Sequence, residues 1–196
     1  MPVRGRTIRT LLVLVDPHQP GATDEVSVLR GTGGRLGLSL TVAETLDEAR
    51  EALGRSWDAI HYAGHQGPTH DDSPALVLRD GALPILELVE RVSVEPPELL
   101  FLNACSTLVP SGVDRGSGHV DFGGLEPVIA SSVPQILGTL WDVKPPDARF
   151  VESFYGTLGE GASAIDALFD ARRTVASSLA WAGTAPAYVL YAQRPD

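Results

Sequence analysis

Short apolar runs, each bounded by turn residues, recur along the chain and predict buried strands. A run of four to eight apolar residues is too short for a typical helix and fits a strand of a parallel sheet that is covered on both faces. A weaker alternation of apolar and polar residues at Leu36–Ala43 predicts one more strand, and Ala75–Leu78 predicts a small one. The clear runs lie at Thr10–Val15, Asp58–Ala63, Leu99–Leu102, Val133–Leu140 and Ala187–Tyr191.

The segments between these runs carry helical signals. Thr45 with Glu48 three residues later forms a capping box, which predicts a helix over Leu46–Leu53 that ends at Gly54. The segment Thr23–Leu29 fits either a short helix or an irregular loop. Loops are expected at Gly31–Gly34, Gln66–Ser73 and, as an exposed loop after the cysteine strand, Leu108–Gly123. Further helices are expected at Leu86–Val92, from Leu125 to Ser131, at Ala148–Leu158 and at Ser163–Ser178.

The alternation of strands and helices predicts the fold class. Such an order builds a mostly parallel sheet with helices on both of its faces, an α/β architecture. The 196 residues suffice for one domain with a substantial core, and the chain shows no repeat or linker. We therefore expect a single domain over residues 1–196.

Composition narrows the function classes. A formal charge of −10 argues against nonspecific binding to nucleic acid or to an anionic membrane surface. No apolar run approaches the length of a membrane span. The single cysteine cannot form an intramolecular disulfide, which fits a reducing compartment. We therefore expect a cytoplasmic protein whose partners are neither nucleic acid nor membrane.

Two polar side chains follow apolar strands at positions suited to catalysis. Cys105 comes directly after the strand at Leu99–Leu102, and His65 comes after the strand at Asp58–Ala63. Ligands and catalytic groups of open α/β sheets sit at the carboxyl ends of the strands. If these strands are neighbours, about 4.8 Å apart, an imidazole could activate the thiol. Spacing alone leaves open that Cys105 is a small core residue and His65 a polar cap.

A metal site is disfavoured, and no cofactor is expected. Five possible ligands are close in the sequence, namely His61, His65, His70, Asp71 and Asp72. On an extended strand, however, four residues separate His61 from His65 by roughly 13 Å, too far for one ion. His61 is interpreted as a structural residue of the strand.

A family resemblance rests on two motifs and their order. The segments Ile60–His65 (IHYAGH) and Leu102–Thr107 (LNACST) resemble the paired signatures of CHAT domains, which are bacterial caspase-like peptidases related to caspases and separase. The resemblance covers most of the chain and is weak before residue 40. It continues at Gly123–Leu125, Val133–Trp141, Phe154–Tyr155, Ser163–Arg172 and Tyr188–Tyr191.

The resemblance implies a caspase-like three-layer α/β/α sandwich with a Cys–His dyad. Cys105 would be the nucleophile, and His65 would act as base to the thiol and then as acid to the leaving amine. Backbone N–H groups of Gln66, Gly67 and Cys105 would form the oxyanion hole. Gln66 stands where the family commonly has glycine, so here a side chain lies beside that hole.

The implied function is that of a cytoplasmic cysteine endopeptidase that cleaves a protein or peptide substrate. Its control by a regulatory protein partner would place it in a bacterial signalling or defence system. The alternative is a catalytically idle CHAT-like interaction module, which Gln66 supports. A glutaminase-type amidotransferase is disfavoured, because Cys105 lacks flanking glycines and its histidine lies upstream.

Two acidic residues are candidates for substrate binding. Asp142 directly follows the Val133–Trp141 run, and Asp147 precedes the next helix. Either carboxylate could pair with an Arg or Lys side chain at P1, the residue before the cleaved bond. A large apolar P1 residue and an acidic one paired with Arg149 are the alternatives, and Asp147 could instead cap its helix.

Overall fold

The structure is a computed structural model that describes residues 7–70, 73–104, 112–113, 120–121, 132–140, 148–176 and 185–192. Its centre is a six-stranded sheet in the order β11-β10-β7-β3-β1-β2. Within this sheet β1, β2, β3, β7 and β10 run parallel, and β11 pairs antiparallel with β10. The bounds are Thr10–Val15 (β1), Ser39–Ala43 (β2), Ala59–Ala63 (β3), Leu99–Asn103 (β7), Gln135–Thr139 (β10) and Tyr188–Ala192 (β11).

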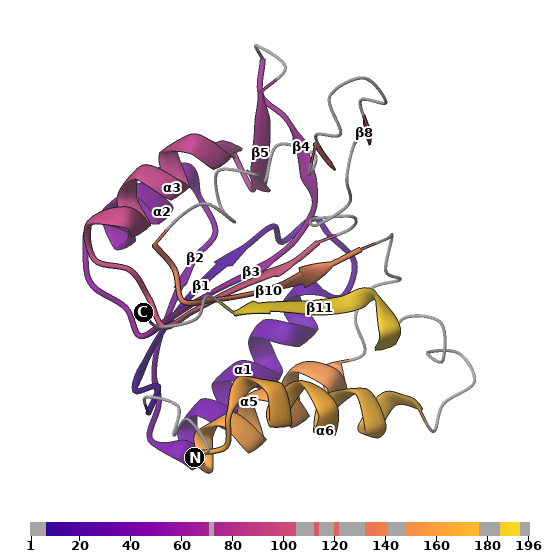
Figure 1. Cartoon of the computed structure of the whole chain (residues 1–196). Coiled ribbons are helices and arrows are strands. Elements are labelled where there is room, and N and C mark those ends of the chain that lie inside the picture. The colour runs from indigo at the N-terminus through magenta and orange to yellow at the C-terminus, as the bar shows by residue number, and fades with distance from the viewer. Residues whose placement is uncertain are drawn as a thin grey trace.

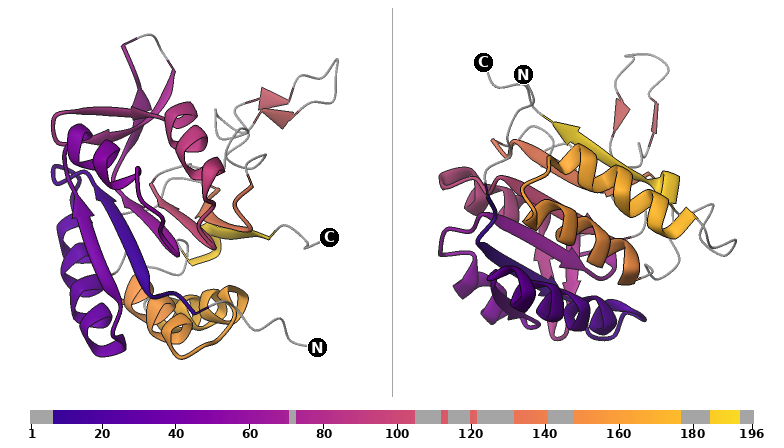
Figure 2. Two further views of the ribbon diagram at one scale, coloured as in Figure 1. Left: turned by 90° about the vertical axis from the view of Figure 1, so that its left-hand side faces the viewer. Right: turned by 90° about the horizontal axis from the view of Figure 1, so that it is seen from below.

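Helices cover both faces of this sheet, as Figures 1 and 2 show. One face carries α2 (Leu46–Ala52) and α3 (Ile85–Val94). The opposite face carries α1 (Ala22–Leu36), α5 (Ala148–Gly159) and α6 (Ala164–Ala176), and a 3-10 turn, Ala185–Ala187, leads into β11. The predicted α/β/α sandwich around a mostly parallel sheet is confirmed. None of the helices in the described part of the chain has the length and apolar character needed to cross a bilayer.

A small antiparallel sheet projects from the same side as α2 and α3 (Figure 1). It consists of β4 (Gln66–Pro68), β5 (Pro74–Leu78) and β6 (Gly81–Pro84). The expected loop over Gln66–Ser73 is therefore wrong at its beginning, because Gln66 pairs with Leu76 across the sheet. A further two-stranded pair is formed by β8 (Gly112–Val113) and β9 (Val120–Asp121), both within the predicted Leu108–Gly123 loop.

The helix α1 resolves the ambiguity at Thr23–Leu29 and corrects the loop expected at Gly31–Gly34. It continues through these glycines, and Thr32 and Gly33 are buried within it. The carbonyl of Gly33 accepts the N–H of Leu38 just after the helix. Gly37 ends the helix in the left-handed conformation, with φ of 67°, and donates its N–H to the carbonyl of Gly33. The following strand consequently begins at Ser39 rather than at Leu36.

Other local predictions are confirmed. The capping box at α2 forms in both directions, since Glu48 N–H donates to the Thr45 hydroxyl and the Glu48 carboxylate accepts from Thr45 N–H. Ser163 caps α6 by accepting from Asp166 N–H at 3.2 Å. The helix expected from Leu125 to Ser131 lies outside the described residues.

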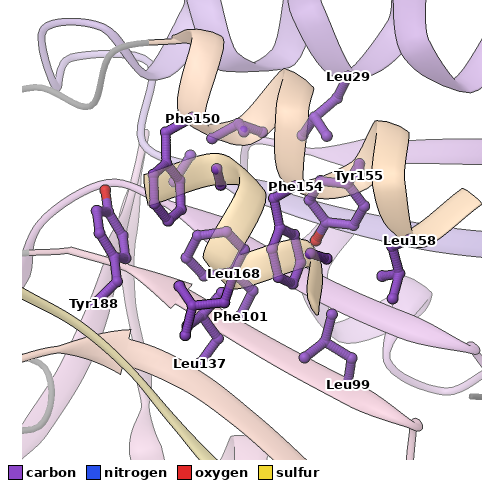
Figure 3. Packing of buried hydrophobic residues seen from close by; sticks show 14 of the residues in the cluster. Leu29, Leu99, Phe101, Leu137, Phe150, Phe154, Tyr155, Leu158, Leu168 and Tyr188 are labelled. Atoms are coloured by element: carbon purple, nitrogen blue, oxygen red, sulfur yellow. The ribbon is translucent and has the colours of Figure 1, made fainter. Parts of the chain in front are cut away.

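The two faces of the sheet bury different side chains. Beneath α1, α5 and α6 lies an aromatic cluster centred on Phe101, whose ring contacts Phe150, Phe154, Tyr155 and Tyr188 (Figure 3). Phe150 and Tyr188 stack with ring centroids 4.0 Å apart. The other face is mainly aliphatic and takes alternate residues from the same strands, including Leu12, Leu14, Ile60, Leu100 and Leu102.

Candidate active site

The strands that precede the two candidate catalytic residues are direct neighbours. β3 and β7 run parallel, and Ala63, the last residue of β3, pairs with Asn103, the last residue of β7. His65 and Cys105 each follow this pair by two residues. The sequence left open whether the two strands are neighbours, and the structure shows that they are. Cys105 itself lies outside the described residues.

Hydrogen bonds hold the two chain segments that leave the sheet after β3 and β7. Gly64 N–H donates to the carbonyl of Asn103 at 3.2 Å, which extends the β3–β7 pairing by one rung. The Thr139 hydroxyl, at the end of β10, donates to the carbonyl of Ala104 at 2.5 Å. On the other side of β3, Asp16 N–H donates to the carbonyl of Ala63 at 3.0 Å. The residues just before His65 and Cys105 are thus fixed by three different strand ends or turns.

His65 has an exposed side chain on a fixed backbone. Its carbonyl lies 2.6 Å from the Tyr62 hydroxyl and accepts Val77 N–H at 3.0 Å. Tyr62 is fully buried, and this burial raises the pKa of its phenol well above the usual range, so the hydroxyl remains a donor. Gly64 allows the Tyr62 hydroxyl to lie this close to the backbone, because a Cβ at position 64 would be only 2.5 Å from the hydroxyl oxygen.

The two proposed oxyanion residues after His65 form the first rungs of β4. Gln66 pairs with Leu76, and Gly67 pairs with Ala75. Antiparallel pairs alternate between hydrogen-bonded and non-hydrogen-bonded types. Because Val77 N–H bonds to the His65 carbonyl, Gln66 occupies a non-hydrogen-bonded pair, and its N–H is directed away from β5.

The chain of buried polar contacts beneath these strand ends begins at His61. One ring nitrogen, Nε2, lies 3.0 Å from Glu25 Oε2, and the other, Nδ1, lies 3.2 Å from the Tyr155 hydroxyl. Glu25 Oε2 also accepts from Asn103 Nδ2 at 2.8 Å, and the Tyr188 hydroxyl donates to Asn103 Oδ1 at 2.9 Å. His61 is therefore a fully buried residue of the fold, as its interpretation as a structural residue requires.

Comparison with known proteins assigns the family. The profile of the CHAT domain matches residues 7–191, which is nearly the whole chain. The chain belongs to the CHAT family. This family is related to caspase-like cysteine peptidases. No curated protein sequence matches the chain.

The match spans both motifs on which the resemblance was based. Of the family-derived site residues, the structure describes His65, Gln66 and Gly67. The nucleophile Cys105 and the two substrate-binding candidates, Asp142 and Asp147, lie outside the described residues. Their roles remain predictions from the sequence.

Sequence reasoning missed the residues that support the CHAT strand ends, above all Glu25 and Asn103. A signal was present, because Glu25, Leu29 and Thr32 recur at helical spacing and all three are buried. Asn103 has the same strand parity as Phe101 and so points to the same face. A carboxylate in register with a buried apolar stripe indicates a buried polar partner, but the sequence does not name it.

No group of three His, Cys, Asp or Glu among the described residues could hold a metal ion. Two cavities found in the described part of the chain lie at the opposite, amino edge of the sheet. One, of about 250 Å³, is lined by residues that precede β1 and β2, including Ile8 and Leu38, and by Tyr155 and Leu158 of α5. The other lies where α2 and α3 end, beside Leu53 and Val94.

Proposed function

We propose that this CHAT protein is a cysteine endopeptidase in which Cys105 and His65 form the catalytic dyad. The observation that supports the proposal is the pairing of Ala63 with Asn103 at the ends of neighbouring parallel strands. Residues two positions beyond such a pair start from strands about 4.8 Å apart. A thiol and an imidazole that begin so close can reach hydrogen-bonding distance.

The chemistry follows from these two groups. His65 takes the proton of the Cys105 thiol, and the thiolate attacks the carbonyl carbon of the substrate peptide. The tetrahedral intermediate collapses as its C–N bond breaks, and His65 returns the proton to the leaving amine. Water, deprotonated by His65, then hydrolyses the thioester, which releases the acid product and restores the thiol.

The negative oxygen of the intermediate needs backbone donors. The N–H groups of Cys105, Gln66 and Gly67 are the proposed donors. Asp142 and Asp147 are proposed to line the pocket for a basic P1 side chain. We further propose a cytoplasmic setting with a regulatory protein partner, which fits the single cysteine of the chain.

The test uses the single cysteine as its own reporter. The substrate is a peptide library made from a denatured proteome. We expect Cys105→Ala and His65→Ala each to lower the rate at which these peptides are cleaved by about 10³-fold or more, because each substitution removes half of the dyad. In His65→Ala, iodoacetamide should alkylate Cys105 with the pH midpoint of an ordinary thiol, above that of the wild type. His70→Ala is the matched control, since His70 is an exposed histidine of the same segment.

Full cleavage by either variant would refute this mechanism. Identical alkylation profiles in the wild type and in His65→Ala, combined with no cleavage, would favour the idle interaction module instead. The observation that favours this second candidate is Gln66, a half-buried side chain where the family commonly has glycine.

A further inference from the structure

Five buried polar side chains from five different elements form one connected chain of hydrogen bonds beneath the strand ends. We call it the Glu25 network. In order of contact it consists of Tyr188 of β11, Asn103 of β7, Glu25 of α1, His61 of β3 and Tyr155 of α5. All five are nearly inaccessible, with exposed fractions of 0% for His61, 1% for Glu25 and Tyr188, 2% for Tyr155 and 3% for Asn103.

A single oxygen atom joins the two central strands. Glu25 Oε2 lies 3.0 Å from His61 Nε2 and 2.8 Å from Asn103 Nδ2, so both strands are bonded to the same carboxylate oxygen. The Asn103 amide is oriented by its two partners, because its NH₂ faces the carboxylate while its oxygen accepts from the Tyr188 hydroxyl.

Such an arrangement is costly in a core that could have been apolar. Burial disfavours the charged carboxylate and raises the pKa of Glu25, in spite of the opposing hydrogen bonds from His61 and Asn103. Replacing a buried ion pair or triad as a whole by well-packed apolar side chains of similar volume is often neutral or stabilising, whereas removing one partner alone is destabilising. The opposite face of the same sheet is covered in this way, by aliphatic residues such as Leu100 and Leu102. Stability alone therefore gives no reason for the network.

The position of the network indicates what it provides. Asn103 is the last residue of β7, and its backbone carbonyl accepts Gly64 N–H while its side chain bonds to Glu25. His61 lies two residues before Ala63, the residue that pairs with Asn103, so both residues of β3 face the same side of the sheet. The two strands are thus joined twice, once through the backbone and once through Glu25 below it. Hydrogen bonds fix distance and direction, whereas apolar contacts allow small sliding movements.

We propose that Glu25 is a positioning residue for the catalytic dyad. By bonding His61 and Asn103 through one oxygen, it holds the ends of β3 and β7 at one spacing, and so sets the separation at which His65 and Cys105 leave the sheet. This proposal rests on the proposed peptidase function. A shift of about 1 Å in such a separation can cost about 10²-fold in rate.

The first test measures kcat and KM in variants of Glu25. Glu25→Ala should lower kcat by about 10- to 100-fold with KM nearly unchanged, because substrate contacts remain while the dyad is misplaced. Glu25→Gln keeps one oxygen that can accept from both His61 and Asn103. Its kcat should therefore be at least tenfold higher than that of Glu25→Ala. Leu29→Ala is the matched control, because Leu29 is fully buried one turn further along α1. It should lower stability while kcat stays within about twofold.

The second test requires no enzyme activity. Amide exchange of Gly64, measured by NMR relative to Ile60 in the middle of β3, should be at least tenfold faster in Glu25→Ala and unchanged in Leu29→Ala. Asn103→Leu, which fills a similar volume without the hydrogen bonds, carries the same expectation if the alanine variant does not fold.

The outcomes separate the two proposals. A wild-type thiol that His65 does not activate, together with faster Gly64 exchange in Glu25→Ala, would refute the peptidase but retain Glu25 as the residue that sets the strand ends. Wild-type kcat and wild-type Gly64 exchange in a folded Glu25→Ala or Asn103→Leu would overturn the positioning role. Equal losses of kcat in Glu25→Ala and Leu29→Ala would overturn it as well, since they would indicate general destabilisation.

Discussion

The two faces of the central sheet solve the same packing problem with different chemistry. The face under α2 and α3 is filled mainly by aliphatic side chains, and its buried Tyr62 bonds upward to the backbone of His65. The face under α1, α5 and α6 combines the aromatic cluster around Phe101 with the Glu25 network. Both faces therefore place their polar contacts close to the carboxyl ends of the strands.

This difference teaches where directional contacts are needed in the fold. Apolar burial stabilises the sheet in proportion to area but specifies position only loosely. Among the described residues, the side-chain hydrogen bonds between buried groups lie towards the carboxyl ends of the strands, where Glu25 bonds to His61 and Asn103 on one face. On the other face, the Tyr62 hydroxyl bonds to the backbone of His65. Three sets of substitutions test this contrast between the two faces.

The largest effect is expected from a second carboxylate on the polar face. Asn103→Asp replaces a donor to Glu25 with a like charge and should lower the free energy of unfolding by about 3–5 kcal/mol at neutral pH. The deficit should shrink as the pH falls, because the pKa of the new carboxyl is raised in the folded state and its protonation restores a donor. Urea unfolding at several pH values measures both effects. A loss no greater than that of Asn103→Leu, about 1–3 kcal/mol, would contradict the expectation.

An intermediate effect is expected on the aliphatic side. In Gly64→Ala the new Cβ would lie 2.5 Å from the Tyr62 hydroxyl oxygen and 2.9 Å from Asp16 Cβ, so we expect a loss of about 1–3 kcal/mol. Combination with Tyr62→Phe should cost somewhat less than the sum of the single changes, since the hydroxyl contact is then absent while the contact with the ring carbon Cζ, at 2.7 Å, remains. Gly31→Ala, where nothing lies within 4 Å of the new Cβ, should instead stabilise the helix by about 0.5–1 kcal/mol. Additive losses in the double variant would show that the hydroxyl does not limit the space.

The smallest effect is expected on the pH dependence of stability, to which two carboxylates should contribute with opposite sign. Burial raises the pKa of Glu25, so its contribution to stability is greatest below the unfolded pKa near 4.5 and is lost as the pH rises through the folded pKa. Hydrogen bonds from Arg50, at 2.9 Å, lower the pKa of Glu87 on α3, so its contribution is present above pH 4.5 and is lost as the pH falls. The stability differences between wild type and Glu25→Gln and between wild type and Glu87→Gln should therefore change in opposite directions from about pH 3 to pH 8. Parallel pH profiles would contradict this assignment.

The sequence by itself determined the class of the fold and the order of its parts. Apolar runs such as Thr10–Val15 and Leu99–Leu102 are local signals of buried strands, and the capping box at Thr45 and Glu48 is satisfied within three residues. The two motifs that end in His65 and in Thr107 carried the family, which the match over residues 7–191 confirmed. The loop predicted at Gly31–Gly34 from its glycines was wrong, because the helix there buries Leu29, Thr32 and Gly33, and such burial is a tertiary effect that local propensity does not reveal.

Only the tertiary structure decided how the strand ends are held. Strand parity could place Asn103 and His61 on one face, but their partner Glu25 lies 36 residues from His61 and 78 from Asn103 along the chain. Tyr188 is 85 residues from Asn103. Contacts at such separations depend on which helix covers which face and on the register of β3 with β7. These follow from the packing of the whole sheet, since no local pattern selects one buried partner for a carboxylate.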